Sequence, residues 1–278
     1  MPYAVRASAL AAATGACFLF FWIGSFLLSW VVLPSACFVL RRTDQTVRVQ
    51  RCQEIVGWGF RLFIASMRTV RNLVFRPWGV ELDVPAGPFV MIANHPTLVD
   101  VTAVMAVHPR ICCVAKTELF QSVLVGKLLR YCGHIEGGGG AMDGATVIRQ
   151  AVSRLRRGHS VLIFPEGTRS PTYGLRRFQP GAFEVALRGD VPIVPLFITC
   201  EPPTLQKGLS WYGLPKRTAV LRIRQLETVA AGRREDAAAM AARFQELYED
   251  ELTAWNAGVP VGERSITGCP SAREMVRP

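Results

Sequence analysis

His95 and Asp100, within the segment Asn94–Asp100, have the residue types of a general base and the carboxylate that orients it. His95 follows an apolar run, and Pro96 prevents that run from continuing as a strand because it lacks an amide hydrogen. We expect a helix to begin near Thr97, so that Asp100 lies in its first turn and reaches back to the imidazole. A carboxylate bonded to one ring nitrogen fixes the tautomer and leaves the other nitrogen as a proton acceptor. The alternative is that His95 only helps to cap the helix.

The chain carries no nucleophile of the hydrolase type. No Ser or Cys lies in a Gly-x-Ser-x-Gly turn, which would present a nucleophile at the end of a strand. The base would therefore act on a hydroxyl group of the substrate. That chemistry suits an acyl donor that is already activated, such as a thioester.

A second polar segment, Pro165–Ser170, also follows a predicted strand. Arg169 offers a planar guanidinium group that matches phosphate or carboxylate. Gly167 lets backbone approach a ligand, and its amide or that of Thr168 can donate to an anion. Glu166 can orient a hydroxyl group or hold Arg169. The alternative is a polar turn without a ligand.

Strands and helices alternate after residue 77, which predicts an α/β domain with a mostly parallel central sheet flanked by helices. The expected strands are Val80–Val84, Phe89–Ala93, Ile111–Ala115, Ser160–Phe164, Val191–Thr199 and Ala219–Gln225. The expected helices are Glu118–Cys132, Asp143–Arg157, Gly181–Arg188 and Arg234–Trp255, of which the first three end at Gly133, Gly158 and Gly189. Functional residues of such sheets gather where strands end. The two polar segments should therefore meet, with Lys116 and Glu118 at the same edge.

The run Ala7–Leu40 contains no charged residue. It exceeds the roughly 20 apolar residues that a bilayer span needs and is too long for a signal-peptide core. We expect residues 1–42 to form a transmembrane helix, or a re-entrant one that turns near Gly24 or Pro34. More arginines follow the run than precede it, so the positive-inside rule predicts that the rest of the chain lies on the cytoplasmic face of the cell inner (plasma) membrane. The alternative is a buried helix of a soluble core.

In the region of residues 43–76, the spacing of charged and apolar side chains predicts a basic amphipathic helix over Thr46–Val74. Charged side chains fall on one half of the helical wheel: Arg48, Arg51, Glu54, Arg61, Arg68 and Arg71. Apolar side chains fall on the other half: Val49, Cys52, Val56, Phe60, Phe63 and Met67. Such a helix can lie in an anionic lipid interface, or it can pack its apolar face on the domain. One long helix could do both.

Composition limits the partners of this chain of 278 residues. Half of its residues are hydrophobic and its net charge is +11, which excludes a disordered or fibrous protein and points to a polyanionic partner. No nucleic-acid-binding motif is found, so anionic membrane lipids are the expected partner and nucleic acid is not. The eight cysteines form no Cys-x-x-Cys pair and no zinc-type cluster with histidine. We expect buried, reduced thiols, no metal and no cofactor.

The two polar segments, in this order, resemble the glycerolipid acyltransferase family, which is 1-acylglycerol-3-phosphate acyltransferase-like. The resemblance covers about Phe89–Leu226 and rests on Asn94-His95-Pro96 through Asp100 and on Phe164-Pro165-Glu166-Gly167-Thr168-Arg169, with further similarity in Lys116-Thr117-Glu118-Leu119-Phe120, Phe178-Gln179-Pro180-Gly181-Ala182 and Val194-Pro195-Leu196. It implies transfer of an acyl chain from acyl-CoA or acyl-carrier protein to a hydroxyl of a lysophospholipid-type acceptor. His95 would be the base, Asp100 would orient it, and Glu166–Arg169 would bind the acceptor. It also implies an N-terminal membrane-binding helical segment.

The sequence departs from this family in one place. Family members usually carry an arginine a few residues after a Gly-x-Ile motif, whereas here Gly133-His134-Ile135-Glu136 runs into four glycines. These glycines form either an anion-binding nest or a flexible loop. Without that arginine, Arg169 is left to hold an anionic acceptor such as 1-acylglycerol-3-phosphate, with Lys116 as a helper.

Two alternatives remain open. The segment Cys200–Gly208, with Trp211-Tyr212, resembles family members of bacterial aryl-polyene pathways, in which a carrier protein would deliver the donor. The other alternative is a non-catalytic lipid-binding membrane protein, against which the intact His95 and Asp100 argue. We expect residues 77–257 to form the acyltransferase domain and residues 258–278 to form a flexible tail.

Overall fold

The computed structural model describes residues 3–71, 73–76, 82–137, 144–208, 210, 212, 215, 217–230 and 236–258. Its strands are β1 Leu73–Arg76, β2 Val90–Ala93, β3 Ile111–Ala115, β4 Ile135–Glu136, β5 Ser160–Ile163, β6 Ile193–Glu201 and β7 Ala219–Gln225. Its helices are α1 Tyr3–Leu27, the π-helical turn η1 Leu28–Val32, α2 Leu33–Val39, α3 Gln45–Thr69, α4 Asp100–Val107, α5 Thr117–Gln121, α6 Gly126–Tyr131, α7 Gly144–Arg156, α8 Gly181–Gly189 and α9 Ala237–Asn256.

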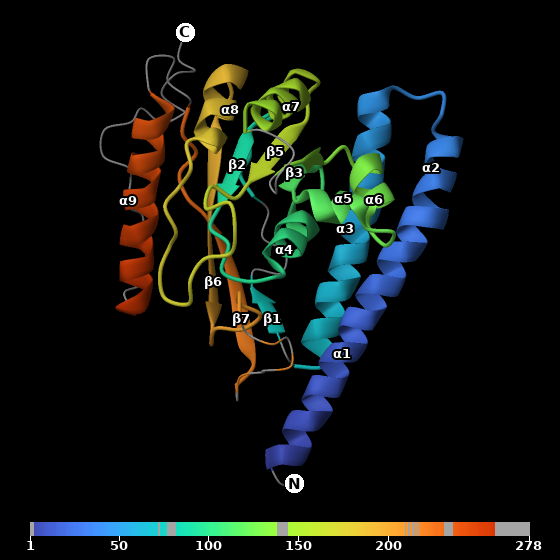
Figure 1. The fold of residues 1–278 in the computed structure, drawn as a ribbon, viewed down its shortest axis with the longest axis vertical. Coiled ribbons are helices and arrows are strands. Elements are labelled where there is room, and N and C mark those ends of the chain that lie inside the picture. The colour runs from blue at the N-terminus through green and yellow to red at the C-terminus, as the bar shows by residue number, and fades with distance from the viewer. Residues whose placement is uncertain are drawn as a thin grey trace.

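The strands form one sheet in the order β1-β7-β6-β2-β5-β3-β4 (Figure 1). All neighbouring pairs are parallel except β6 and β7. Alternate side chains of β2 point to opposite faces: Met91 joins the core beneath α3 and α4, and Ile92 joins the core beneath α7, α8 and α9. The predicted fold class, a mostly parallel sheet between layers of helices, is confirmed.

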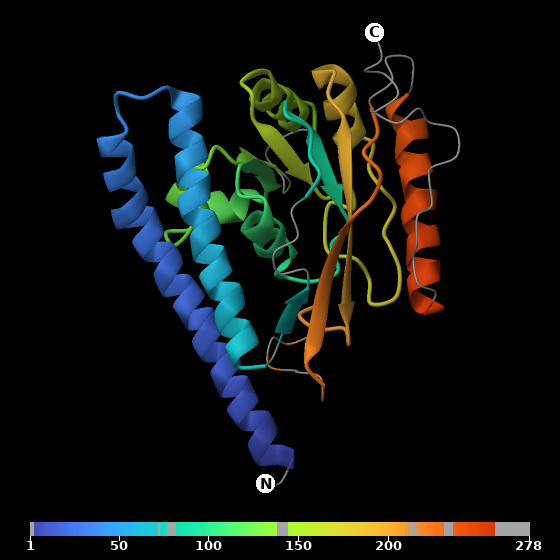
Figure 2. The same cartoon turned by 180° about the vertical axis from the view of Figure 1, so that it is seen from behind.

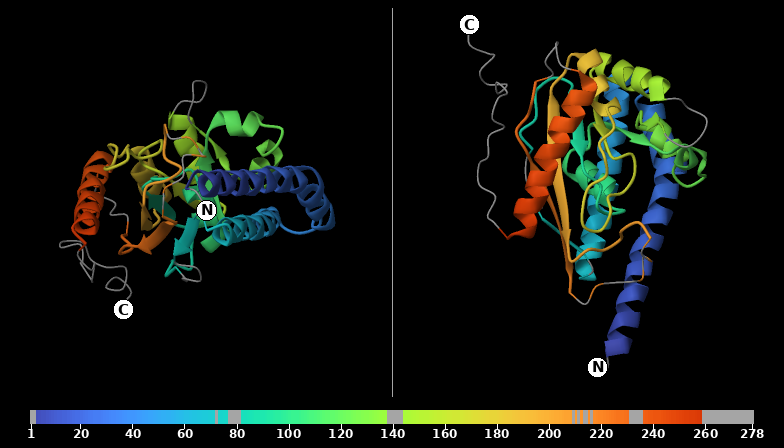
Figure 3. Two further views of the ribbon diagram at one scale, coloured as in Figure 1. Left: turned by 90° about the horizontal axis from the view of Figure 1, so that it is seen from below. Right: turned by 60° about the vertical axis from the view of Figure 1, so that its left-hand side comes forward.

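The N-terminal apolar run is helical throughout and does not turn at Gly24 or Pro34. The chain turns only after α2, and α3 runs back alongside α1 (Figure 2). Phe21 of α1 packs on Phe63 of α3 with ring centroids 4.8 Å apart. The segment Ser8–Val39 is long and apolar enough to cross a membrane. Only 22% of its most apolar stretch of 18 residues is buried inside the protein. α1 also extends past the end of the sheet (Figure 3).

The helix predicted over Thr46–Val74 is shorter than expected. α3 ends at Thr69, Arg71 adopts a positive φ of 56° that a helix cannot continue, and residues 73–76 form β1, which pairs in parallel with β7. The apolar face of α3, with Cys52, Val56, Phe63 and Met67, is buried against the domain. The packing interpretation of this face is confirmed, while Trp58 and Leu62 on another face of α3 are exposed.

The helix predicted over Glu118–Cys132 is also wrong, because it is divided into α5 and α6. The backbone turns between them, and Gly126 approaches Phe120 so closely that an added Cβ atom would lie 2.3 Å from its carbonyl oxygen. The expected strand Val80–Val84 is not found over residues 82–84, and residues 80–81 lie outside the described part. The short β4 was not predicted. The other predicted strands and helices are found with bounds shifted by three residues at most.

Seven of the eight cysteines lie in the described part, and all seven are free thiols. Burial raises the pKa of Cys112 to about 11 and that of Cys113 to about 12. These thiols are therefore protonated at neutral pH and behave as small apolar side chains.

Candidate active site

The two polar segments meet at one edge of the sheet. His95 follows β2, Pro165–Ser170 follows β5, and Lys116 follows β3, and these three strands are parallel neighbours. The backbone amide of His95 donates to Glu166 Oε1 over 3.0 Å, which joins the first two segments directly. Lys116 is exposed at the start of α5, and among the described residues it makes no hydrogen bond to the other two segments.

Asp100 holds the imidazole of His95. Asp100 is the first residue of α4 and is fully buried, and its Oδ2 lies 2.8 Å from His95 Nδ1. Thr97 holds the carboxylate in turn, because its amide donates to Oδ2 over 2.7 Å and its hydroxyl to Oδ1 over 2.5 Å. A carboxylate only accepts hydrogen bonds, so Nδ1 carries the proton and Nε2 is left as the acceptor. The predicted contact between His95 and Asp100 is confirmed.

The ring of His95 is fixed in a partly open position. Its side chain is 17% exposed, and Phe164 packs on one face with ring centroids 4.4 Å apart. No described residue donates to or accepts from Nε2. This nitrogen is therefore available to a substrate hydroxyl group.

Glu166 has a different place from the expected one. Its carboxylate is buried and does not pair with Arg169: Oε1 accepts from the His95 amide and the Ser170 hydroxyl (2.6 Å), and Oε2 accepts from the Arg176 amide (2.8 Å). The alternative in which Glu166 holds Arg169 is therefore wrong. Glu166 instead fixes the backbone that carries His95.

Ser170 contacts the backbone of His95 on both sides of its Cα atom. Its hydroxyl lies 3.2 Å from the His95 amide nitrogen, and its own amide donates to the His95 carbonyl over 2.8 Å. Asn94 adds a further constraint, since its side-chain amide exchanges two hydrogen bonds with the backbone of Ile198 in β6. Sequence reasoning missed the supporting roles of Asn94, Thr97 and Ser170. The only signal was that polar residues adjoin His95 and Arg169.

Arg169 reaches across to the segment that follows β6. Its Nη1 donates to the Leu205 carbonyl over 3.1 Å, and the same carbonyl accepts the Leu98 amide over 3.0 Å. Arg169 is half-buried, and its other guanidinium donors have no hydrogen bond within the described chain. Gly167 is exposed and adopts a positive φ of 69°, which favours glycine. Thr168 is half-buried beside it.

The Gly-x-Ile motif contributes to the core. The amide of Cys113 donates to Nδ1 of the buried His134, and burial lowers the pKa of His134 to about 4. His134 is therefore neutral, and its role is structural. Of the four glycines for which the sequence left a nest or a loop open, Gly138, Gly139 and Gly140 lie outside the described residues. Over the residues that are described, no group of three or more His, Cys, Asp or Glu side chains could hold a metal ion.

Comparison with known proteins shows a similarity to acyltransferases. Residues 78–199 match the family model described as Acyltransferase. The chain is 34% identical over 165 residues to the human 1-acyl-sn-glycerol-3-phosphate acyltransferase beta, covering 57% of this chain and 55% of the relative. It is 33% identical over 115 residues to the 1-acyl-sn-glycerol-3-phosphate acyltransferase of Cocos nucifera, covering 40% and 37%. The chain thus spans about half the length of the first of these relatives and less of the second.

The fold matches a solved structure over nearly its whole length. The 1-acyl-sn-glycerophosphate acyltransferase from Thermotoga maritima superposes with a TM-score of 0.68, covering 93% of this chain and 99% of that one at 18% identity. At this identity the match shows a shared fold. Residues 78–199 of this chain are thus similar to the acyltransferase family, and the two sequence relatives are 1-acyl-sn-glycerol-3-phosphate acyltransferases.

Proposed function

We propose that this protein is a membrane-bound O-acyltransferase that transfers an acyl chain from a thioester to a hydroxyl group of a lysophospholipid, with 1-acylglycerol-3-phosphate as the first candidate acceptor. The observation that carries this proposal is the His95 imidazole, which is held through Nδ1 by a buried aspartate and has Nε2 free. It lies in one site with Arg169, a donor suited to phosphate. The names of the sequence relatives support the same reaction.

The reaction follows from this geometry. Nε2 of His95 removes the proton of the acceptor hydroxyl as its oxygen attacks the thioester carbonyl. Asp100 stabilises the imidazolium that forms. The tetrahedral intermediate then collapses by breaking the carbon–sulfur bond, and His95 returns the proton to the leaving thiolate. The Gly167 amide already donates to the Phe164 carbonyl over 3.0 Å, so the amide of Thr168 is the candidate donor to the negatively charged oxygen of the intermediate.

The acceptor is bound on the side of Arg169. We infer that its guanidinium group binds the acceptor phosphate through the donors that Leu205 leaves free. Lys116, exposed at the neighbouring strand end, adds a second positive charge. Glu166 acts through His95 and the loop backbone, because both of its oxygens are already bonded within the protein.

The surface around the site suits a lipid substrate. Leu98, beside His95, is exposed, as are Leu119 and Val123 of the α5 region. The helix of Ser8–Val39 presents many more exposed apolar side chains, among them Phe26 and Trp30. We propose that this helix holds the protein in the inner membrane, that anionic lipids attract its arginines, and that the α/β domain lies on the cytoplasmic face.

Replacing Arg169 should weaken acceptor binding selectively. A charge-assisted hydrogen bond contributes about 1.5–3 kcal/mol, so we expect Arg169→Ala to raise the KM of a phosphate-bearing acceptor roughly 10- to 100-fold and to leave the KM of the donor nearly unchanged. Arg169→Lys should recover only part of the loss, since a point charge lacks the planar guanidinium geometry. Steady-state kinetics with each substrate varied in turn would measure both constants.

Arg177→Ala is the matched control for this substitution, because Arg177 is an exposed arginine of the same loop. If Arg169 only supports the loop through Leu205, both KM values and the melting temperature would worsen together. That result would remove Arg169 from the acceptor site.

Ser170 should affect turnover more than binding. Ser170→Ala removes a hydroxyl that contacts the His95 amide and Glu166. A hydrogen bond of about 0.5–1.5 kcal/mol corresponds to a loss of roughly two- to tenfold in kcat, with little change in KM. Ser66→Ala is the control, since that hydroxyl bonds only to Phe63 within α3. An unchanged kcat for Ser170→Ala would mean that the Ser170 hydroxyl is not needed to hold the His95 backbone.

The donor and acceptor are tested together with the full chain in its membrane. Acyl-CoA and acyl-carrier protein are each offered with 1-acylglycerol-3-phosphate and with a lysophospholipid that lacks the phosphomonoester. We expect transfer to the phosphomonoester from at least one donor. A different result would favour the specialised-lipid alternative and contradict the proposed acceptor. In that result, acyl-carrier protein is the only donor that works, and the acyl chain is transferred to another lipid hydroxyl but to neither glycerolipid.

A further inference from the structure

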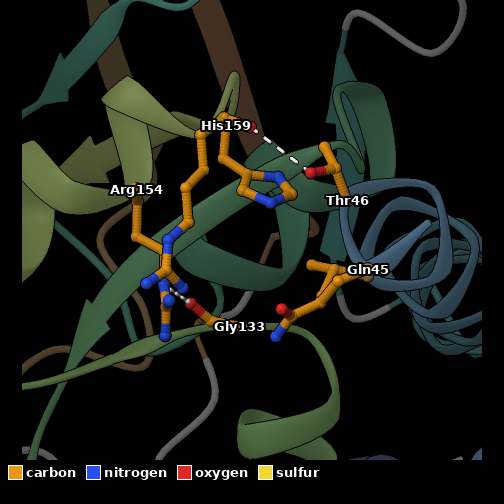
Figure 4. A pocket seen from close by; sticks show the side chains of 7 residues that line it. Gln45, Thr46, Gly133, Arg154 and His159 are labelled. Atoms are coloured by element: carbon orange, nitrogen blue, oxygen red, sulfur yellow. Dashed lines mark hydrogen bonds between the residues drawn. The ribbon is translucent and has the colours of Figure 1, made fainter.

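A small cavity lies at the end of the sheet opposite His95, between the first turn of α3 and the C-terminal end of α7. His159 comes directly before β5, whereas the polar segment Pro165–Ser170 follows it, so the cavity and the candidate active site lie at opposite ends of that strand. The volume of the cavity is about 30 Å³, enough for about two water molecules or for part of a tetrahedral anion. Its lining includes Gln45, Thr46, Gly133, Arg154, Arg157 and His159 (Figure 4).

The imidazole of His159 lacks a protein partner. The residue is only 6% exposed, and its ring makes no hydrogen bond to any other described residue. The ring points into the cavity beside Thr46 and Arg154 (Figure 4). Buried polar groups in proteins are almost always hydrogen-bonded. A ligand or water in the cavity is therefore the natural partner of this ring.

The charges around the cavity are mainly positive. Burial, together with the guanidinium groups of Arg154 and Arg157, lowers the pKa of His159, and Asp44 opposes this effect. Nε of Arg154 donates to the Gly133 carbonyl over 2.8 Å, so its terminal nitrogens remain as donors. Arg157 is exposed at the rim of the cavity.

The first turn of α3 does not itself supply the site. Asp44 accepts the Thr46 amide over 2.6 Å and so caps this helix. The donors available to a ligand are therefore side chains: the two guanidinium groups, the imidazole and the Gln45 amide. Thr46 touches the α7 side only through a long contact of 3.5 Å between its hydroxyl and the Arg157 carbonyl oxygen.

We propose that this cavity binds a phosphate-type anion, which Arg154, Arg157 and His159 hold between α3 and α7. Guanidinium groups match the oxygens of phosphate in charge and geometry, and Asp44 is the one carboxylate that acts on His159 within the described chain. The anion is either free phosphate or the phosphate group of a membrane lipid. The exposed Arg41 and Arg42, which follow the apolar helix and precede the cavity in the chain, are placed to attract either form. A bound anion would fasten the N-terminal helical hairpin to the domain.

Thermal unfolding of the full chain in detergent tests the free anion. At about ten times the dissociation constant, inorganic phosphate should raise the Tm by roughly 3–5 °C relative to sodium chloride of equal ionic strength. Arg157→Gln and His159→Gln should each abolish most of this rise. Arg156→Gln should retain it, because Arg156 is a neighbouring exposed arginine of α7 that does not line the cavity.

The titration of His159 gives a second readout. The charged groups that act on its ring are Asp44 from the cap of α3, Arg154 from α7 and Arg157, which directly follows α7. A bound anion should raise the pKa of His159, as followed by NMR of the histidine rings. The chain has four histidines. The ring signal that disappears in His159→Gln is the signal of His159. The pKa values of His108 and His134, which do not line the cavity, should stay unchanged.

Vesicles distinguish the two sources of phosphate. If free phosphate has no effect, Arg157→Gln should still weaken binding to vesicles that contain phosphatidic acid, and by more than Arg156→Gln does. Binding to neutral vesicles should be the same for both variants. That result assigns the site to a lipid headgroup. If Arg157→Gln, His159→Gln and Arg156→Gln respond alike to phosphate and to both vesicles, the cavity is not an anion site. All three variants should keep their acyl-transfer activity, so a failure of this proposal is distinct from a failure of the proposed function.

Discussion

His95→Ala is expected to reduce acyl transfer by about 10²–10⁴-fold, the usual contribution of a general base. The substitution removes the nitrogen that accepts the proton of the acceptor hydroxyl and leaves the backbone contacts of residue 95 with Glu166 and Ser170 in place. The protein should therefore remain folded and bound to the membrane. The initial rate, the Tm and the membrane fraction of the variant measure these three expectations.

His108→Ala is the matched control for this experiment. His108 lies at the far end of α4 and packs on Phe89, with ring centroids 5.5 Å apart. We expect it to lower the Tm modestly and to leave the rate nearly unchanged. A His95→Ala rate within about threefold of the wild type, equivalent to about 0.7 kcal/mol of activation free energy, would show that His95 is not the base.

Asp100→Asn is expected to cost about 10- to 100-fold in kcat, less than the loss of His95 itself. Asparagine keeps the shape of the side chain but cannot stabilise the imidazolium, and a hydrogen bond to a charged group is worth about 1.5–3 kcal/mol. The amide must also place its oxygen toward His95 and the Thr97 amide, since both donate to the same carboxylate oxygen. The KM of each substrate should change little.

Asp236→Asn is the control for Asp100→Asn, because Asp236 also accepts backbone amides at the start of a helix but lies far along the chain, at α9. Equal rates for both variants would mean that Asp100 only holds the Thr97 backbone and hydroxyl before α4. A loss for Asp100→Asn that exceeds the loss for His95→Ala would reverse the assigned roles.

Local sequence patterns predicted the elements that carry the site. β3 and β7 have the predicted bounds because β-branched and apolar residues form short, clearly bounded runs there. The contact between His95 and Asp100 was predictable because a five-residue separation across a strand end and a helix start is fixed by local geometry. The same reasoning placed the Pro165–Ser170 segment at the same edge of the sheet, since parallel neighbouring strands end together.

Features that depend on tertiary contacts were not predictable. Residues 73–76 continue the basic and apolar pattern of α3, and only pairing with β7, about 145 residues later in the chain, makes them a strand. Glu166 was expected to orient a hydroxyl group or to hold Arg169, yet its partners are the amides of His95 and Arg176 and the hydroxyl of Ser170. No local pattern indicates which of several nearby donors a buried carboxylate accepts. The break between α5 and α6 likewise arises from the close approach of Gly126 to Phe120.

The central proposal is transfer of an acyl chain to a lipid hydroxyl by the His95–Asp100 pair, and mass spectrometry of the products tests it most directly. Purified full-length protein in vesicles is mixed with isotope-labelled acyl thioester and 1-acylglycerol-3-phosphate, and the labelled diacyl product and labelled free fatty acid are measured over time. We predict that the label appears in the diacyl product, that free fatty acid stays at the level without protein, and that His95→Ala loses at least about 10²-fold of this transfer. Label that appears only as free fatty acid, or in the diacyl product at equal rates with and without His95, would contradict the proposal.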